Sequence, residues 1–318
     1  MLTLDALVDL DVLACPVCRA PVRREEGRWL CAGATCPHGR EPFPVVGGQP
    51  ALVDFRHSVL DPERLRAEEG ASEVNRSPLA TLYRRLVHPA NTTAPANVAR
   101  MLELLRADAG AVGRAPRVLV VGGGTVGDGL ESLYADPSVD VVSFDVYASA
   151  ATQFVGDGHA IALADGSVDG VIVQAVLEHV LEPAVVAGEI ARVLRTGGIV
   201  YADTPFLQQV HEGAYDFTRF TESGHRALFR SFERIDSGTV AGAGTALRWS
   251  VDHWVRALTR SVPLGRIVAL LFFWLSWTDR FLDPRHSSDS ASSVFFLGRK
   301  SERELTPAEA IAHYRGGM

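Results

Sequence analysis

The strongest constraint on the fold lies in residues 118–129, where an apolar run passes directly into a glycine-rich segment, VLVVGGGTVGDG. A short apolar run that ends in glycines is typical of a buried parallel strand followed by a turn and a helix. Gly122, Gly124 and Gly127 have the spacing G-x-G-x-x-G, which permits a tight turn and lets a ligand approach the backbone N–H groups. The segment therefore predicts a nucleotide-binding turn between a strand and a helix.

A second strand strengthens this prediction because it ends in a carboxylate. Residues 139–145, VDVVSFD, end in Asp145, whose oxygens would accept hydrogen bonds from ribose hydroxyls. At this point the pattern fits a nicotinamide dinucleotide as well as another adenosine cofactor. The alternative is a glycine turn and a surface aspartate in an α/β protein that binds no nucleotide.

Helical and strand patterns alternate along the middle of the chain. We expect a helix over 96–107 ahead of the first strand, and another over about 183–194 between later strands. Further strands are expected at 151–155, 169–174, 198–203, 232–240 and 293–300. Such alternation predicts an α/β fold with a doubly wound, largely parallel, Rossmann-like sheet and a helical, Trp-rich insertion before the last strand.

Composition excludes some classes of protein. The 318 residues are 47% hydrophobic and 22% charged, which is typical of a packed globular chain. The net charge of −7 argues against broad nucleic-acid binding. The first residues carry Asp5, Asp9 and Asp11 with no basic region, unlike a secretory signal, so a cytoplasmic location is expected.

All four cysteines fall near the N-terminus. Cys15 and Cys18 form a C-P-V-C pair, Cys31 follows after twelve residues, and Cys36 after four more. In a reducing compartment this spacing favours one tetrahedral structural zinc, with His38 close enough to replace Cys36. A redox pair and an empty knuckle are the alternatives. The run CPVC…C…C…FPVVGGQPAL, roughly the first 55 residues, resembles the zinc-ribbon module that accompanies some methyltransferases.

The choice of nucleotide rests on residues 156–206, GDGHAIALADGSVDGVIVQAVLEHVLEPAVVAGEIARVLRTGGIVYADTPF. This run resembles class I S-adenosylmethionine-dependent methyltransferases of the type 11 kind: a loop Asp, L-x-x-x-D-G-S-x-D, Leu-Glu-His-Val, and a helix ending in Arg-x-Gly-Gly. The resemblance covers about residues 95–235, and the last strand SVFFLGRK is also similar. It implies methyl transfer and disfavours an NAD-linked oxidoreductase.

Carried over to this chain, the resemblance implies a set of contacts to S-adenosyl-L-methionine. These are Gly122 and Gly124 at the methionine portion, Asp145 on the ribose, Asp157 on the adenine amine, Gly158 and His159 at the ring edge, and Gln174 with Ala175 under the cofactor. The chain departs from the family at Val120, where an acidic residue is usual, and at Val126, where a glycine is common. A degenerate methyltransferase fold that acts as a binding or scaffold protein is therefore the alternative.

The segment after the fifth central strand, residues 204–221, resembles the acceptor loop of methyltransferases of glycan and lipid-glycan pathways. We expect His211 to act as general base and Asp216 to orient it, with Tyr215 and Arg219 on the substrate side. His179 is a second candidate catalytic residue, or a residue that caps its own turn. Asp216 and Arg219 are three residues apart and could simply pair with each other.

Residues 267–278, IVALLFFWLSWT, form an uncharged segment within a larger insertion. Twelve residues are fewer than the roughly 20 that cross a bilayer. With its tryptophans and the arginines around it, the region 262–282 could lie in a membrane interface, at the inner face, or contact a lipid-linked substrate. A helix buried against the sheet and a homodimer interface are the alternatives.

Together these inferences predict an enzyme (EC 2.1.1.-) that O-methylates a sugar, glycan or small metabolite, with S-adenosyl-L-methionine as cofactor, a structural zinc, and no nucleic-acid partner. The expected organisation is a zinc-ribbon-like module at 1–55, a helical connecting arm at 56–94, a methyltransferase domain at 95–300 with the insertion at 241–290, and a tail at 301–318.

Overall fold

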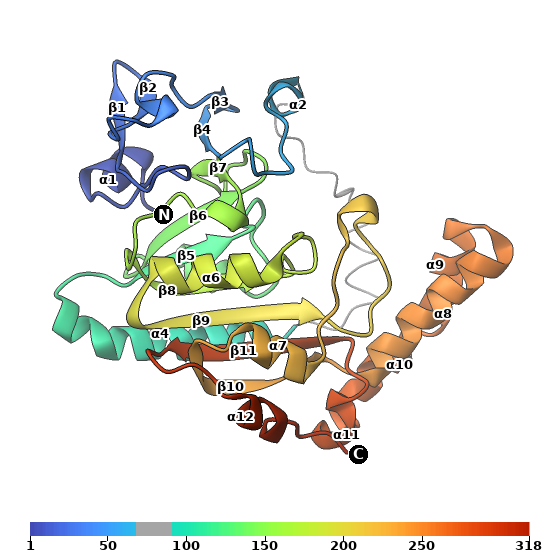
Figure 1. The fold of residues 1–318 in the computed structure, drawn as a ribbon. Coiled ribbons are helices and arrows are strands. Elements are labelled where there is room, and N and C mark those ends of the chain that lie inside the picture. Colours follow the sequence, from blue (N-terminus) through green and yellow to red (C-terminus); the bar gives the residue numbers. More distant parts are fainter. Residues whose placement is uncertain (68–90, 318) are drawn as a thin grey trace.

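A computed structural model describes residues 1–67 and 91–317, and its centre is a nine-stranded sheet (Figure 1). The strand order is β10-β11-β9-β8-β5-β6-β7-β4-β3. The six neighbouring strands from β9 to β4 run parallel to one another. At one edge β11 pairs antiparallel with β9 and β10 antiparallel with β11, and at the other edge β3 pairs antiparallel with β4. The predicted doubly wound α/β sheet is thereby confirmed. Most of the predicted connecting arm, at 68–90, lies outside the described residues.

The central strands coincide with the apolar runs of the sequence. Their bounds are β5 Arg117–Val121, β6 Asp140–Asp145, β7 Phe154–Gly156, β8 Val168–Gln174, β9 Leu194–Pro205, β10 Phe232–Ala241 and β11 Ser293–Lys300. β7 begins later than predicted, because Ala151 and Thr152 form a turn in which the Thr152 hydroxyl bonds to Gln49 and Ser149. β9 is longer than predicted because β11 pairs along Ile199–Pro205.

Helices cover both faces of this sheet, as the alternation of strands and helices predicted. α4 (Thr93–Val112) and α5 (Glu131–Ala135) pack on one face, where Val118 and Val120 of β5 point. α6 (Pro183–Val193) packs on the other with Leu119 and Val121. Successive strand residues therefore bury opposite faces, as a strand covered on both sides requires. The remaining helices beside the sheet are α7 Glu222–Leu228, α12 Pro307–Ala312 and the short 3-10 turns η2 Gly158–Ala160 and η3 Gly213–Tyr215.

The N-terminal module is joined to the sheet. It contains α1 Leu4–Asp9, β1 Val22–Glu25, β2 Arg28–Cys31, η1 Pro37–Gly39, β3 Val45–Val46 and β4 Gln49–Leu52, and α2 Pro62–Ala67 follows it. The run 41–50, EPFPVVGGQP, indicates a strand that ends in a glycine turn, and the structure contains this turn. Gly47 and Gly48 both have positive φ and join the short strand β3 to β4 in a hairpin. β4 then pairs in parallel with β7, so the module extends the sheet.

The insertion before the last strand is a helical projection that we call the arm, residues 243–282 (Figure 1). It consists of α8 Ala243–Thr259, α9 Val262–Leu271, α10 Trp274–Thr278 and the turn η4 Asp279–Phe281, and α11 Pro284–Ser288 returns the chain to β11. Among the described residues, no single helix is long and apolar enough to cross a membrane. Val262–Leu271 and Trp274–Phe281, bent by 42°, meet that length and composition only as a pair.

Candidate functional site

The glycine turn and the carboxylate after the neighbouring strand meet at the carboxyl edge of the sheet. β5 and β6 are parallel, so Gly122 and Asp145 follow strand ends that lie side by side. The backbone N–H of Gly124 donates to Asp145 Oδ2 at 2.7 Å. A Cβ at Gly124 would stand 2.6 Å from that oxygen and 2.3 Å from Tyr147 Cζ, so this position admits only glycine without rearrangement.

Gly122 and Gly127 also have close neighbours. Gly122 has φ +72°, and a Cβ there would lie 2.3 Å from Val176 Cγ2. A Cβ at Gly127 would lie 2.1 Å from Gln174 Oε1. The three glycines predicted from the spacing therefore shape one turn around the ends of β5 and β8.

Gln174 lies at the end of β8 with one buried polar atom left open. Its amide nitrogen donates to Asp203 Oδ2 at 3.2 Å and to the Asp128 carbonyl at 3.3 Å. Its buried Oε1 accepts no hydrogen bond from the described residues. Burial raises the pKa of Asp203 to about 6, while Tyr201 and Gln174 bond to its carboxyl group. The open acceptor beside the glycine turn suits an incoming ammonium or hydroxyl group.

Asp157 is buried at the end of β7 and already has partners within the chain. His159 donates its backbone N–H to Asp157 Oδ1 at 2.9 Å, and its ring Nδ1 lies 2.6 Å from the same oxygen. The hydroxyl of Ser58 donates a short hydrogen bond to Oδ2. Burial opposes ionisation of Asp157, but the bonds from His159 and Ser58 outweigh it and lower its pKa. Sequence reasoning missed Ser58, because nothing in the local pattern places residue 58 against residue 157.

The remaining predicted cofactor residues and the two departures from the family are also placed. Gly158 is buried against Val186. Ala175 has φ +51°, a left-handed backbone at the end of β8. Val120 is buried in the core between strand neighbours, and Val126 is exposed in the turn. A carboxylate is therefore absent from the apolar position of β5, where the family usually has one.

The loop after β9 brings His211 and Asp216 together, as predicted. The His211 backbone N–H donates to Asp216 Oδ2 at 2.9 Å, and His211 Nδ1 lies 3.4 Å from the same oxygen. Arg219 Nη2 donates to Asp216 Oδ2 at 2.8 Å, so the alternative pairing is present as well. Burial raises the pKa of Asp216, but the bonds from Arg219 and the His211 N–H dominate and hold it well below the usual range.

His179 and Glu178, at the end of β8, face the same loop. His179 Nδ1 lies 2.7 Å from the carbonyl of Tyr215, and the rings of His179 and His211 are 5.1 Å apart. Burial lowers the pKa of His179. Glu178 is fully buried and burial raises its pKa to about 8. Sequence reasoning counted Glu178 only as part of a family pattern and missed it as a site residue, although its place beside His179 was the available signal.

A cavity of about 1500 Å³ opens between β10, the start of α8 and the α10–α11 region. Its lining includes Asp128, whose carbonyl accepts a bond from Gln174, and Glu222, Thr245 and Asp279. Neither predicted catalytic histidine lines it, so the acceptor is not assigned to this cavity.

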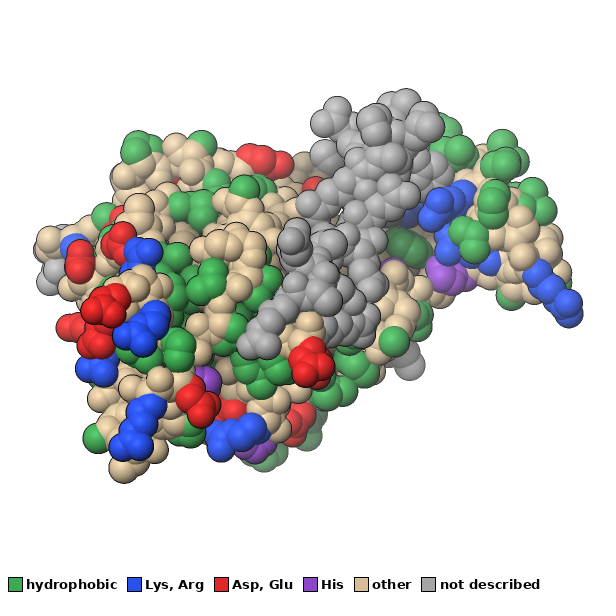
Figure 2. All heavy atoms as spheres, turned by 90° about the horizontal axis from the view of Figure 1, so that it is seen from above, with side chains coloured by type: hydrophobic (Ala, Val, Ile, Leu, Met, Phe, Trp, Pro, Cys, Tyr) green, Lys and Arg blue, Asp and Glu red, His purple; other side chains and the backbone are tan. Residues whose placement is uncertain are grey.

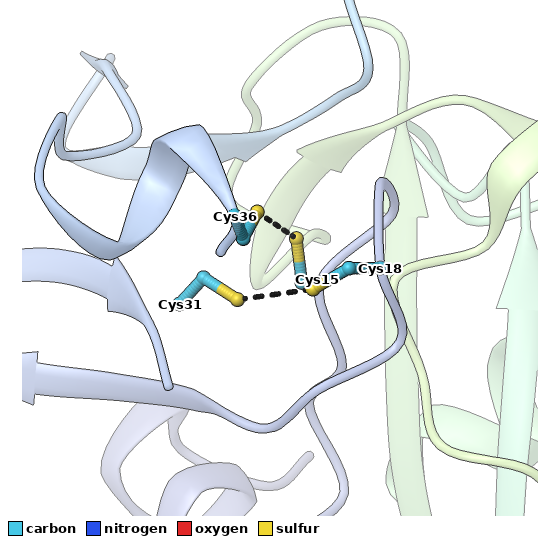
Figure 3. A group of neighbouring side chains, drawn as sticks. All are labelled: Cys15, Cys18, Cys31 and Cys36. Carbon is cyan, nitrogen blue, oxygen red and sulfur yellow. Dashed lines mark hydrogen bonds between the residues drawn. The ribbon is translucent and has the colours of Figure 1, made fainter. Parts of the chain in front are cut away.

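The four cysteines form a second centre, in the N-terminal module (Figure 3). Their sulfur atoms point toward one another and all lie within 4.8 Å, with Cys18 Sγ 3.3 Å from Cys31 Sγ and Cys15 Sγ 3.7 Å from Cys36 Sγ. His38 instead stacks on Phe43 at 4.0 Å between ring centroids, outside this group. Four converging thiols are the donor set that tetrahedral zinc prefers.

Comparison with known proteins identifies the central segment. Residues 119–202 match a family described as a methyltransferase domain. The chain carries a methyltransferase domain. The match begins inside β5 and ends inside β9, so it contains the glycine turn, Asp145, Asp157 and Glu178. No curated protein matches the chain.

Several solved structures share a distant likeness with the methyltransferase domain. A putative sarcosine dimethylglycine methyltransferase from Galdieria sulphuraria is 14% identical, with 71% of this chain and 99% of that one covered and a TM-score of 0.42. A SAM-dependent methyltransferase from Archaeoglobus fulgidus is 12% identical, with 70% of this chain and 99% of that one covered and a TM-score of 0.43. Haemonchus contortus phosphoethanolamine N-methyltransferase 2 is 14% identical, with 70% of this chain and 57% of that one covered and a TM-score of 0.42. These likenesses are distant, so the assignment rests on residues 119–202.

Proposed function

We propose that the protein is an S-adenosylmethionine-dependent methyltransferase that acts on a hydroxyl group of a sugar, a glycan or another small metabolite. The observation that carries the proposal is the meeting of Gly124 and Asp145 at the carboxyl edge of the sheet, the same edge at which a cluster of ionisable groups follows β8 and β9. Ligands of such sheets bind at this edge. The family match over 119–202 supports methyl transfer over hydride transfer.

The chain offers one group for each part of the cofactor. Asp145 would accept from the ribose hydroxyls, and the open Oε1 of Gln174 would accept from the methionine ammonium group. Asp157 would accept from the adenine amine. Its carboxylate already receives bonds from Ser58 and His159, so adenine must use the remaining lone pair or displace the Ser58 hydroxyl.

The bound cofactor supplies an electrophilic methyl group on a sulfonium. Methyl transfer to an acceptor hydroxyl would require the protein to hold the acceptor in line with that methyl group and to remove the hydroxyl proton. We propose His211 for the proton, with Asp216 fixing its ring and Arg219 fixing Asp216. His179 Nδ1 lies 2.7 Å from the backbone carbonyl of Tyr215, so His179 contacts the loop that carries His211.

Calorimetric titration with S-adenosylmethionine, S-adenosylhomocysteine and NAD tests this proposal. We expect the first two to bind, and Asp145→Ala to weaken both by more than about tenfold because a charge-assisted bond to the ribose is lost. Ile311→Ser, an exposed apolar substitution on α12, is the matched control and should leave binding unchanged. Binding of NAD alone would replace the proposal by an oxidoreductase.

A second candidate is a binding protein that keeps the fold without turnover. The hydrogen bond between Ser58 and Asp157 favours it, because a segment of the chain itself occupies the predicted adenine partner. Calorimetry distinguishes the two: a scaffold would bind neither adenosyl compound, and Ser58→Ala would not restore binding.

We also propose that Cys15, Cys18, Cys31 and Cys36 hold one structural zinc ion, supported by their converging sulfur atoms (Figure 3).

A further inference from the structure

Glu178 is a buried carboxylate whose oxygens accept no hydrogen bond from the described residues. Its side chain is 1% exposed. Its backbone carbonyl, in contrast, accepts from the N–H groups of Phe217 and Thr218 at 2.8 and 3.2 Å, which fixes the loop after β9 over it. Buried carboxylates are ordinarily bonded, so two open oxygens at one site indicate a missing positive group.

Two histidines turn their free ring nitrogens toward this carboxylate. His179 Nδ1 lies 2.7 Å from the Tyr215 carbonyl, and His211 Nδ1 lies 3.3 Å from the Gln209 carbonyl. A carbonyl only accepts, so each Nδ1 carries the proton and each Nε2 carries a lone pair. Both Nε2 atoms face Glu178 Oε1, at 3.6 Å from His179 and 4.0 Å from His211.

These distances are longer than a hydrogen bond and are close to the distances between ligand atoms that share one metal ion. One ligand atom from each residue can be chosen so that all three lie within 4.8 Å of one another. Ligands about 2.1 Å from a shared cation lie about 3 to 3.4 Å apart, so closure would bring each histidine nitrogen about 0.2 to 1 Å closer to Glu178 and would bring the two histidine ligand atoms, which lie within 4.8 Å, to that spacing. A single proton could satisfy one carboxylate oxygen, whereas a cation would satisfy all three groups.

We propose that Glu178, His179 and His211 bind a divalent first-row transition cation. Two imidazoles and one carboxylate suit such an ion better than magnesium or calcium, which prefer oxygen ligands alone. Nδ1 hydrogen bonds that fix each ring are the usual support for histidine ligands. The histidine side chains are 21% exposed, so ions and an acceptor can reach the site.

The role of this cation rests on the proposed function. Bound there, it would coordinate the acceptor hydroxyl and lower its pKa. His211 would then be a metal ligand in place of the general base proposed above, and the proton would leave to water. The acceptor class narrows accordingly to molecules with an oxygen that can coordinate the ion, such as a vicinal diol of a sugar.

Titration with Mn²⁺, followed by loss of the free-ion electron paramagnetic resonance signal, tests the site on full-length protein with its cysteines loaded with zinc. Thiolates keep zinc in preference to manganese, so the two centres are separable. We expect one saturable Mn²⁺ per chain, weakened more than about tenfold in Glu178→Gln and His179→Asn. His286→Asn, at an exposed histidine of α11, is the control and should bind like the parent protein.

Absence of saturable Mn²⁺ binding, or equal affinity in Glu178→Gln, would overturn the cation site. Calorimetry with S-adenosylmethionine on the same samples keeps the two proposals apart. Retained cofactor binding without Mn²⁺ binding removes only the cation, whereas Mn²⁺ binding without cofactor binding removes only the proposed function.

The arm is the basis of a second, independent inference. Its helices bury charged side chains and expose large apolar ones. Toward its interior α8 buries Arg248 and Asp252. Arg248 Nε bonds to Ser276 Oγ at 3.0 Å, and Asp252 Oδ1 accepts from Arg256 Nε at 2.8 Å. Polar groups thus satisfy one another inside, whereas helices in water usually bury their apolar face.

Large apolar side chains cover the outside of the arm (Figure 2). They are exposed by 37 to 69% at Leu247, Trp254, Leu258, Val262, Leu264, Ile267, Leu271, Phe272, Phe273, Trp274 and Trp277, and Phe281 reaches 81%. The structure therefore contradicts the expectation of a helix buried against the sheet. An apolar surface of this extent marks a contact with something outside the chain.

Charge indicates what that contact is. The arm, residues 243–282, carries five arginines (Arg248, Arg256, Arg260, Arg266 and Arg280) against two aspartates (Asp252 and Asp279), a net charge of +3 within a chain of net charge −7. Arg280 lies 4.6 Å over the ring of Trp277 at the end of the same surface. Arginines beside exposed tryptophans and leucines fit the boundary of an anionic bilayer, where cations meet headgroups and apolar side chains meet acyl chains.

We infer that the arm lies in the interface of an anionic membrane. Its root adjoins the acceptor loop, because Ser250 of α8 bonds to Gln209 at 3.0 Å and Trp249 lies 6.4 Å from His211. Binding would thus bring the loop after β9 near the bilayer surface.

Co-sedimentation with vesicles of phosphatidylglycerol and phosphatidylcholine, against phosphatidylcholine alone, tests this. We expect salt-sensitive binding to the anionic vesicles, reduced more than about fivefold in the double variant Phe272→Ser, Trp274→Ser. Ile311→Ser, 79% exposed but outside the arm, is the control. No vesicle binding, or binding unchanged in the double variant, overturns the inference; if the arm instead drives dimer formation in sedimentation velocity, a second copy is its partner.

Discussion

The N-terminal module and the arm are both additions to one sheet, and they are built in opposite ways. Leu7, Val12 and Leu13 of the module are buried in the same apolar cluster as Leu119 of the central strand β5. In the arm, Leu258 and Leu271 are more than 60% exposed while Arg248 and Asp252 are buried. The module therefore obtains its apolar environment from the domain, whereas the arm must obtain one from outside.

The hydrogen bonds that join each addition to the rest of the chain also differ between the module and the arm. The module is tied to the domain by Leu2 N–H to Val141 O at 3.0 Å, by Ala14 N–H to Ala162 O at 3.0 Å, and by the β4–β7 pairing. The arm is tied at its root, where Asp279 accepts from Gly242 and Gly244. An insertion that projects from such a root can change its outer surface without disturbing the core, so it is a place where a partner can be accommodated.

Loss of metal from the module should have the largest effect on stability, and a far larger one than changes in the arm. Cys31→Ser should remove zinc and lower the stability of the whole domain by several kcal/mol, because the module shares its core and zinc binding contributes to folding. Thermal unfolding with zinc content measured by mass spectrometry checks this. The arm variant Phe272→Ser, Trp274→Ser should unfold close to the parent temperature; if Cys31→Ser did so too, the module would need no metal.

The same substitution in the two regions should give unequal losses. Leu7→Ala leaves a cavity in a closed core and should lower the free energy of unfolding by about 2–5 kcal/mol. Leu258→Ala, at a side chain 64% exposed, should change it by less than about 0.5 kcal/mol. Urea unfolding of both variants measures the difference, and equal losses would break the comparison.

A loss smaller than that of Leu7→Ala should come from the root of the arm. Asp279→Asn weakens the acceptor of the Gly242 and Gly244 N–H groups and of the Thr245 hydroxyl, so it should cost about 0.5–2 kcal/mol. Hydrogen exchange should rise in α8 and α9 while β5 and β8 keep their protection. Equal acceleration in the sheet would show that the arm is part of the cooperative core.

Much of the fold could be predicted from local pattern. The strand ending at Val121, the helix from Pro183 and the last strand, 293–300, follow from apolar runs, glycines and proline, which act within a few residues. The glycine turn at Gly47 and Gly48 could be predicted, whereas the strand Gln49–Leu52 after it could not, because proline is disfavoured within strands. The pairing of β4 with β7 joins residues a hundred positions apart, which no local pattern indicates.

The candidate site divides along the same line. The sequence predicts Asp216 beside His211, and the structure places them together. It predicts that Gly124 and Asp145 contact one cofactor, and in the structure the Gly124 N–H donates to Asp145. Ser58 and the open oxygens of Glu178 could not be predicted, because burial and orientation at a tertiary contact decide them. Whether the apolar residues of the arm face outward or are buried could not be predicted, since an apolar helix has the same sequence in a core and at a surface.

The most direct test of the account is a crystal structure of the protein grown with S-adenosylmethionine. The account predicts adenosine across the carboxyl edge of the sheet, with its ribose hydroxyls on Asp145 and its methionine ammonium group toward Gln174. Density at another place, or an edge that stays filled by Ser58 and its neighbours at saturating cofactor, would contradict it.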